Sequence, residues 1–118
     1  MIVNVLGTEY AITIKSHEQE PYFKKKSCDG FENCNTKEIT ILDLDTSEQW
    51  EDDTKEAKAI ATKAIIRHEI THAFFDESGL QTSSCSFTGG WATNEEMVDW
   101  IALQFPKIQK AFESVDAL

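Results

Sequence analysis

The sequence predicts an α+β domain in which a small N-terminal sheet packs against helices formed by the rest of the chain. Short β-branched runs occupy the first 44 residues, and an apolar repeat at three- and four-residue steps begins near residue 57. Strand patterns come first and helical patterns later, without alternation, which is typical of the α+β class. The chain has 118 residues and no Pro/Gly-rich linker, so residues 1–118 are expected to form a single domain.

Three short runs have the composition of strands: they are residues 2–6, 10–14 and 37–44. The first ends at Gly7, and the second alternates between apolar and polar positions. The third carries polar Thr40 and Asp43, which indicates a strand near a sheet edge. Residues 16–36 are polar and are expected to form a loop with about one helical turn. These patterns predict an antiparallel or mixed sheet of about three strands.

A long helix is expected after residue 45. Apolar, small and histidine residues recur on one face: Ala57, Ile60, Ala61, Ala64, Ile65, His68, His72 and Phe75. A capping box at the start of this helix is offered by Thr46 with Gln49, or by Asp53 with Glu56. Gly79 supplies a stop of the Schellman type.

The C-terminal part is expected to hold two further helices. A loop of small residues leads to a helix over residues 93–104, which begins with Thr93 and Glu96 as a capping box. Pro106 suits the first turn of a new helix better than the interior of an existing one. A short C-terminal helix over residues 106–116 is therefore expected.

The charge balance bears on the class of partner. The chain has 11 Lys and Arg against 21 Asp and Glu, which gives a formal net charge of -10. Binding to nucleic acid is not expected, because phosphate neutralisation requires basic side chains. The apolar runs are too short to span a bilayer, so no membrane contact is expected. The first six residues lack the charged start and long apolar stretch of a signal peptide, which favours the cytoplasm.

Three cysteines, Cys28, Cys34 and Cys85, do not form a disulfide framework, because an odd number leaves one thiol over. Free thiols in a reducing compartment are the expected state. Cys28 and Cys34 flank a turn-like stretch, and they remain candidates for a pair or for half of a metal site.

The segment His68-Glu69-Ile70-Thr71-His72 is an H-E-x-x-H motif within the expected long helix. Residues four apart share a helical face, so His68 and His72 can reach one metal ion. Glu69 lies about 100° around the helix and can approach a metal-bound water without being a ligand. Because chance gives such a motif in only about one chain in a hundred of this composition, the pattern indicates one zinc ion with Glu69 as general base.

A catalytic zinc site needs a third protein ligand. The candidates are Asp76, Glu77, Glu95, Glu96, Asp99, His17 and the cysteines. The third ligand should come from another element than the histidines, and Glu96 already serves the capping box. Glu95 is therefore the favoured ligand, and Asp99, one turn further on, is placed to accept the free N–H of a ligand imidazole.

The motif at His68–His72, followed by Asn94-Glu95-Glu96-Met97-Val98-Asp99, resembles the gluzincin pattern H-E-x-x-H then N-E-x-x-x-D of thermolysin-like peptidases. The small size and the stretch from residue 72 to 80 are more similar to phage- and mobile-element-encoded peptidases related to the ImmA/IrrE group and to minimal gluzincins. The resemblance implies a zincin-like fold, with zinc held by His68, His72 and Glu95. It also implies that Glu69 is the base and that Asp99 supports a ligand histidine.

These features predict a hydrolase, a zinc metallopeptidase that cleaves a peptide or protein substrate. The peptide is expected to pair with the strand at residues 37–44 and to lie across the zinc. Four side chains are candidates for stabilising the oxyanion: Tyr10, His17, Tyr22 and Arg67. The alternative is a non-catalytic or self-inhibited zinc-stabilised regulatory module, with residues 112–118 folded back over the cleft. Glu69 favours the enzyme, because a structural zinc site has no use for that carboxylate.

Overall fold

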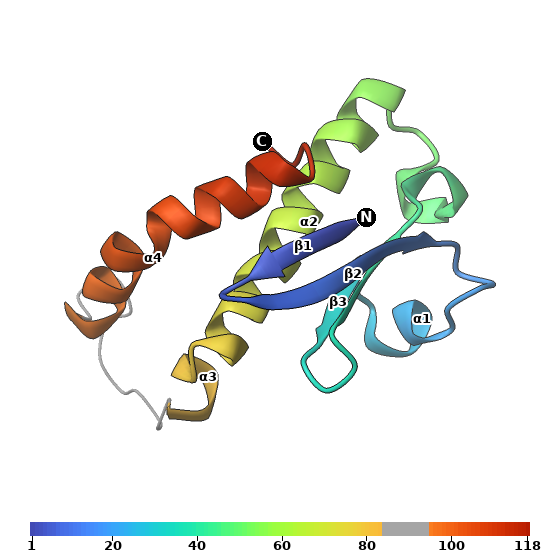
Figure 1. The fold of residues 1–118 in the computed structure, drawn as a ribbon. Helices are drawn as coiled ribbons and strands as arrows, with labels where there is room; N and C mark the ends of the chain where they lie inside the picture. Colours follow the sequence, from blue (N-terminus) through green and yellow to red (C-terminus); the bar gives the residue numbers. More distant parts are fainter. Residues whose placement is uncertain (84–94) are drawn as a thin grey trace.

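The computed structural model describes residues 1–83 and 95–118, apart from the side chains of residues 82, 83, 95, 96, 98, 99 and 102. Its strands are β1 (Ile2–Val5), β2 (Thr8–Lys15), β3 (Gly30–Asn33) and β4 (Glu38–Leu42). Its helices are α1 (Tyr22–Lys26), α2 (Lys55–Glu77), α3 (Leu80–Ser83) and α4 (Glu95–Ser114), and two 3-10 turns cover Leu44–Thr46 and Glu48–Trp50. Figure 1 shows the sheet lying against α2, with α4 beside α2 on the side of β1. The predicted α+β class is confirmed.

The sheet has four strands in the order β1-β2-β4-β3, rather than the expected three. β1 and β2 form an antiparallel hairpin, β2 and β4 run parallel, and β3 and β4 form a second antiparallel hairpin. The segment read as an edge strand is therefore interior. Thr40 is only 4% exposed, and Ile41 and Leu42 are buried in different clusters, because β4 is covered on both faces. A polar Thr is compatible with this position because its β-branched side chain suits a sheet.

The outer edge of the sheet next to α2 belongs to β3. The Leu42 N–H donates to the Asp29 carbonyl oxygen at 2.8 Å, and Phe31 and Asn33 lie opposite Thr40 and Glu38. Hydrogen-bonded and non-hydrogen-bonded pairs alternate along an antiparallel ladder. The backbone groups of Gly30 and Glu32 therefore point away from β4, toward the open edge.

Two apolar clusters hold the elements together. The larger one joins one face of the sheet to α2, α4 and the C-terminal residues: Val3, Val5, Tyr10, Ile12, Ile39, Ile41, Ile66, Ile70, Ala73, Phe74, Ile108, Ala111, Val115 and Ala117. The smaller one, built on Phe23, Leu42 and Leu44, closes the side of α1 and the 3-10 turns. Within the part of the chain described, no helix has an apolar stretch long enough to cross a bilayer.

α2 begins at neither of the two expected capping boxes. Its N-cap is Thr54, whose side-chain oxygen accepts from the Ala57 N–H at 3.1 Å, so neither Thr46 nor Asp53 takes that position. The 3-10 turns use the preceding residues and delay the helix. The expected stop is confirmed: Gly79 follows α2 with φ of +77° and donates its N–H to the Asp76 carbonyl oxygen.

The C-terminal helix is continuous, contrary to the expected break at Pro106. The start predicted at Thr93 lies outside the described residues, and α4 runs from Glu95 to Ser114 with Pro106 inside it. A proline costs one helical hydrogen bond and crowds the preceding turn. Burial of Ile108 and Ala111 after it, on the helix face that also carries the partly buried Trp100, offsets this cost.

Candidate metal centre

The H-E-x-x-H motif occupies the second and third turns from the C-terminal end of α2. His68 and His72 lie one turn apart on an exposed face, with their Nε2 atoms 3.1 Å apart and their ring centroids 4.7 Å apart. Two nitrogens at this 3.1 Å separation, each about 2.0–2.1 Å from one zinc ion, subtend about 100° at the metal, near the tetrahedral angle. This separation is therefore compatible with both nitrogens binding one metal ion.

The protonation of His72 also suits a metal. Burial, and secondly the neighbouring His68, lower the pKa of His72, because both penalise the imidazolium form. A neutral imidazole is the form that binds a metal ion. In the metal-free chain the same distance lets one neutral ring donate its Nε2–H to the other.

Glu69 points from α2 toward β3 rather than toward solvent. The residue is 6% exposed, and burial raises the pKa of its carboxyl group to about 7. Gly30 makes this arrangement possible, because a Cβ at that position would lie 3.0 Å from Glu69 Oε1 and 2.7 Å from Ile65 Cγ2. The edge strand therefore approaches the helix at the residue predicted to be the base.

A cleft of about 470 Å³ runs between α2, α1 and β3 and brings the motif together with residues far away in the sequence. His68, Glu69 and His72 line it from α2, and Gly30 lines it from β3. Among the four candidates for oxyanion stabilisation, Tyr22 lines this cleft and is 40% exposed.

The other three candidates are held elsewhere. Tyr10 is fully buried and donates its hydroxyl to Glu77 at 2.8 Å. Arg67 donates to the Ala117 carbonyl oxygen, and His17 packs edge-on against Phe23. None of the three lines the cleft formed by the described residues.

A second group of ligand-type atoms borders the same cleft, and the sequence indicated two of its three members, Cys34 and Asp76, as candidate ligands. Donor atoms of Glu32, Cys34 and Asp76 lie within 4.8 Å of one another. Burial, and secondly the charge of Asp76, raise the pKa of Glu32 to about 7. Glu32 was missed because its segment was read as loop. The signal was the turn-forming Asn33 to Thr36 before β4, where Asn33 Oδ1 accepts from two backbone N–H groups and closes a hairpin.

Two further candidates for the third zinc ligand, Glu77 and Cys28, differ in their surroundings. Glu77 is not free for a metal, because its carboxylate accepts from Thr8, Tyr10 and Lys37. These hydrogen bonds, led by that of Lys37, lower the pKa of Glu77. Cys28 lines the cleft, and burial raises the pKa of its thiol.

The predicted ligand from the second motif lies on the first turn of α4. The backbone of Glu95 begins that helix and Asp99 follows one turn later, but the side chains of Glu95, Glu96 and Asp99 lie outside the described part. Cys85 also lies outside it.

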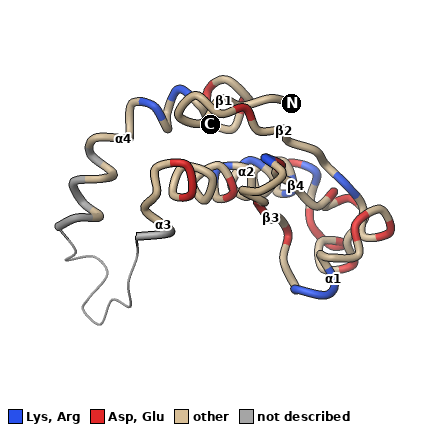
Figure 2. Tube along the Cα trace, turned by 60° about the horizontal axis from the view of Figure 1, so that its bottom comes forward, with Lys and Arg blue, Asp and Glu red and all other residues tan. Residues whose placement is uncertain are grey.

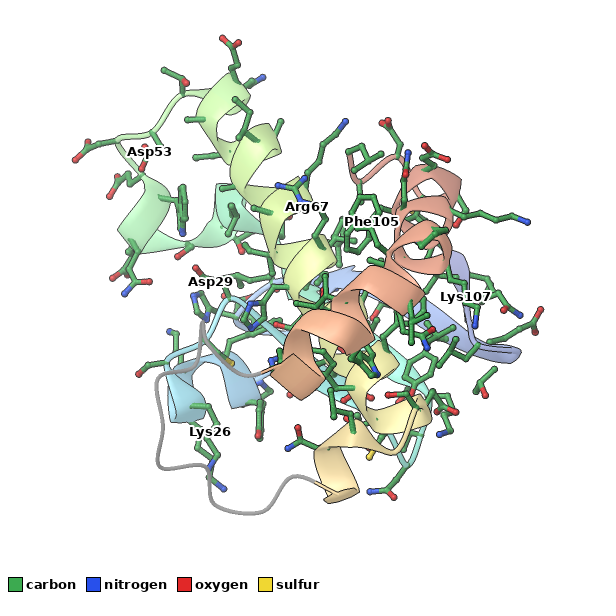
Figure 3. All side chains as sticks on the ribbon, turned by 90° about the vertical axis from the view of Figure 1, so that its left-hand side faces the viewer. Lys26, Asp29, Asp53, Arg67, Phe105 and Lys107 are labelled. Carbon is green, nitrogen blue, oxygen red and sulfur yellow. The ribbon has the colours of Figure 1, made fainter. Side chains whose placement is uncertain are left out.

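The C-terminal residues do not form the cover suggested by the self-inhibited alternative. Ala117 is fully buried in the larger cluster, and Lys63 pairs with Asp116. In Figure 3 Asp29, which precedes β3, lies on one side of α2, and Phe105 of α4 lies on the other. Residues 112–118 contribute nothing to the lining of the cleft between α2, α1 and β3.

The histidine pair, the buried carboxyl group and the strand edge thus share one cleft. Comparisons of the chain with protein-family models, with curated proteins and with solved structures found no match.

Proposed function

We propose that the protein is a zinc-dependent metallopeptidase. His68, His72 and Glu95 bind one zinc ion, Glu69 is the general base, and Asp99 orients a ligand histidine. The single observation that supports this most is the pair of Nε2 atoms 3.1 Å apart, with a buried carboxyl group beside them in an open cleft. The gluzincin-like spacing of the two sequence motifs supports the same assignment.

When bound, zinc lowers the pKa of a coordinated water toward neutrality and polarises a carbonyl group. Glu69 accepts the proton of the attacking water and delivers it to the leaving amine. A carboxyl group with a pKa of about 7 suits both steps, because it is present in both protonation states near neutral pH. Tyr22 is assigned to the developing oxyanion, since its hydroxyl-bearing ring lines the cleft.

The substrate backbone pairs with β3 in this proposal, not with β4. The open edge presents the backbone N–H and C=O groups of Gly30 and Glu32, and these residues line the cleft with the motif. An extended peptide that adds to this edge passes along α2 at His68 and Glu69. Strand addition selects an extended, unfolded segment as substrate.

The assignment is tested by replacing Glu69 with Gln and measuring zinc content and cleavage of a mixed peptide library. We expect Glu69→Gln to retain zinc and to lose hydrolysis by at least about a hundredfold, because the proton acceptor is gone. Glu56→Gln is the matched control, since this exposed carboxylate lies in the first turn of the same helix. Equal cleavage by wild type and Glu69→Gln, or zinc binding without cleavage by either, would favour the regulatory module.

The third ligand is tested separately through zinc affinity. Glu95→Ala is expected to weaken zinc binding far more than Glu96→Ala, because only Glu95 is assigned to the metal. Competition with a chromogenic chelator measures both constants. The reverse ranking would identify Glu96, rather than Glu95, as the third zinc ligand.

A further inference from the structure

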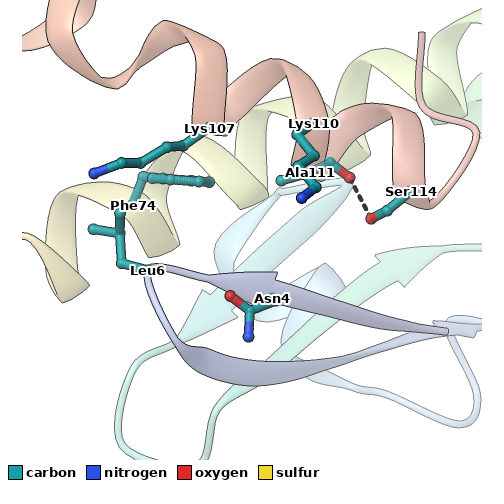
Figure 4. A pocket seen from close by; sticks show the side chains of 7 residues that line it. All are labelled: Asn4, Leu6, Phe74, Lys107, Lys110, Ala111 and Ser114. Carbon is teal, nitrogen blue, oxygen red and sulfur yellow. Dashed lines mark hydrogen bonds between the residues drawn. The ribbon is translucent and has the colours of Figure 1, made fainter.

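A groove on another part of the molecule lies between α4, the end of α2 and the turn that joins β1 to β2. Its volume is about 290 Å³, and Figure 4 shows its lining side chains, which include Leu6, Phe74, Lys107 and Lys110. In the described part of the chain, none of its lining residues belongs to the cleft at His68.

The lining of the groove is part apolar and part polar. Phe74 and Ala111 reach it from α2 and α4 but are only 1% and 5% exposed, Leu6 closes it from the turn, and Asn4 and Ser114 add polar side chains. Leu6 and Gly7 form the two-residue turn with φ of +52° and +98°. Such a turn favours Asn before Gly, and a bulky residue is strained there. The chain nevertheless places a leucine at this position, 37% exposed, which presents an apolar side chain at the groove.

The rim of the groove is basic, although the molecule is acidic. Lys107 and Lys110 are the only charged residues between Trp100 and Phe112, and residues 2–7 contain none. Neither lysine forms an ion pair with any residue in the described ranges. In Figure 2 the blue part of α4 lies next to β1. Two ammonium groups without an ion-pair partner among the described residues thus border this groove in a chain of net charge -10.

We infer that this groove binds an acidic peptide segment of a partner protein, with an apolar side chain against Leu6 and carboxylates on Lys107 and Lys110. The exposed Leu6 side chain suits an apolar group, and the two lysines suit anions beside it. Nucleic acid is disfavoured because two lysines are too few to neutralise its phosphates.

The inference is tested by selecting binders to the full-length protein from a displayed random-peptide library. The enriched peptides are expected to share an aromatic or aliphatic residue flanked by Asp or Glu. Their dissociation constants are then measured by fluorescence polarisation at low and high ionic strength. Binding should weaken with salt, because each rim contact is an exposed ion pair.

Three variants locate the binding. Lys107→Glu with Lys110→Glu should weaken the selected peptides about tenfold or more, because two attractive pairs become repulsive. Leu6→Asn should also weaken them, while Asn retains the left-handed turn. Lys24→Glu with Lys25→Glu is the control, since these lysines are exposed on α1 and outside the groove.

The inference is overturned if no peptide is enriched, if the enriched peptides lack carboxylates, or if charge reversal at Lys107 and Lys110 leaves their binding unchanged. Binding of anionic lipid vesicles or of nucleic acid that requires the same two lysines, in place of peptide binding, would also overturn it.

Discussion

Substitution of Gly30 by Ala tests the close approach of β3 to α2. The new Cβ would lie 2.7 Å from Ile65 Cγ2 and 3.1 Å from Glu69 Cγ, whereas non-bonded carbons prefer about 3.5–4.0 Å. Relief requires a shift of about 0.8 Å between strand and helix. Ile65 cannot rotate away easily, because β-branched side chains are stiff in helices. Overpacking of this kind costs about 1–3 kcal/mol.

The cost is measured by urea unfolding of the metal-free protein. With a slope of about 2 kcal/mol per molar urea, Gly30→Ala should lower the midpoint by about 1 M. The same substitution in an Ile65→Ala background should cost clearly less, because the obstructing methyl group is absent. An unchanged midpoint, or an equal loss in both backgrounds, would refute the close approach. Neither result depends on the proposed activity.

Three further substitutions probe the scaffold. Thr54→Ala should lower the unfolding free energy by about 1 kcal/mol in urea titrations, because the Ala57 N–H loses its cap; no loss would place the helix start elsewhere. The pKa of Glu77 lies below its ordinary value of 4.5, so its charge stabilises the fold above that pH and the benefit disappears as pH falls through the lowered value. Wild type should therefore exceed Glu77→Gln in stability at pH 7, and the difference in stability should disappear as the pH falls below 4.5 and through the lowered pKa; a constant difference would contradict this. Pro106→Ala should raise the melting temperature, because alanine restores a helical N–H donor worth about 1–3 kcal/mol; a lower melting temperature would mean that the proline is needed by the packing of α4.

Local patterns predicted those features that depend on neighbours along the chain. The histidine spacing placed His68 and His72 on one face of α2, since a helix repeats every 3.6 residues. Gly79 marked the end of that helix, because glycine adopts positive φ at little cost. The predicted start of α2 was wrong because several residues before Lys55 can serve as an N-cap. The 3-10 turns that precede the helix depend on the packing of Leu44 in the smaller cluster, which local patterns do not reveal.

Features that depend on distant contacts were not predictable in this way. Whether residues 37–44 form an edge or an interior strand depends on β3, which is too short and polar to be recognised alone. The continuity of α4 through Pro106 depends on burial of Ile108 and Ala111 against the core, a tertiary effect that overrides local preference.

The sequence by itself determined the α+β class and the placement of His68, Glu69 and His72 along the long helix, because both follow from the spacing of residues close together in the chain. Only the tertiary structure decided what faces these residues. It placed Gly30 against Glu69, brought Glu32 beside Asp76, and kept the C-terminal residues away from the cleft. The physical reason is that pairing between strands is chosen by burial across the whole chain, whereas a helix fixes its faces by its own repeat.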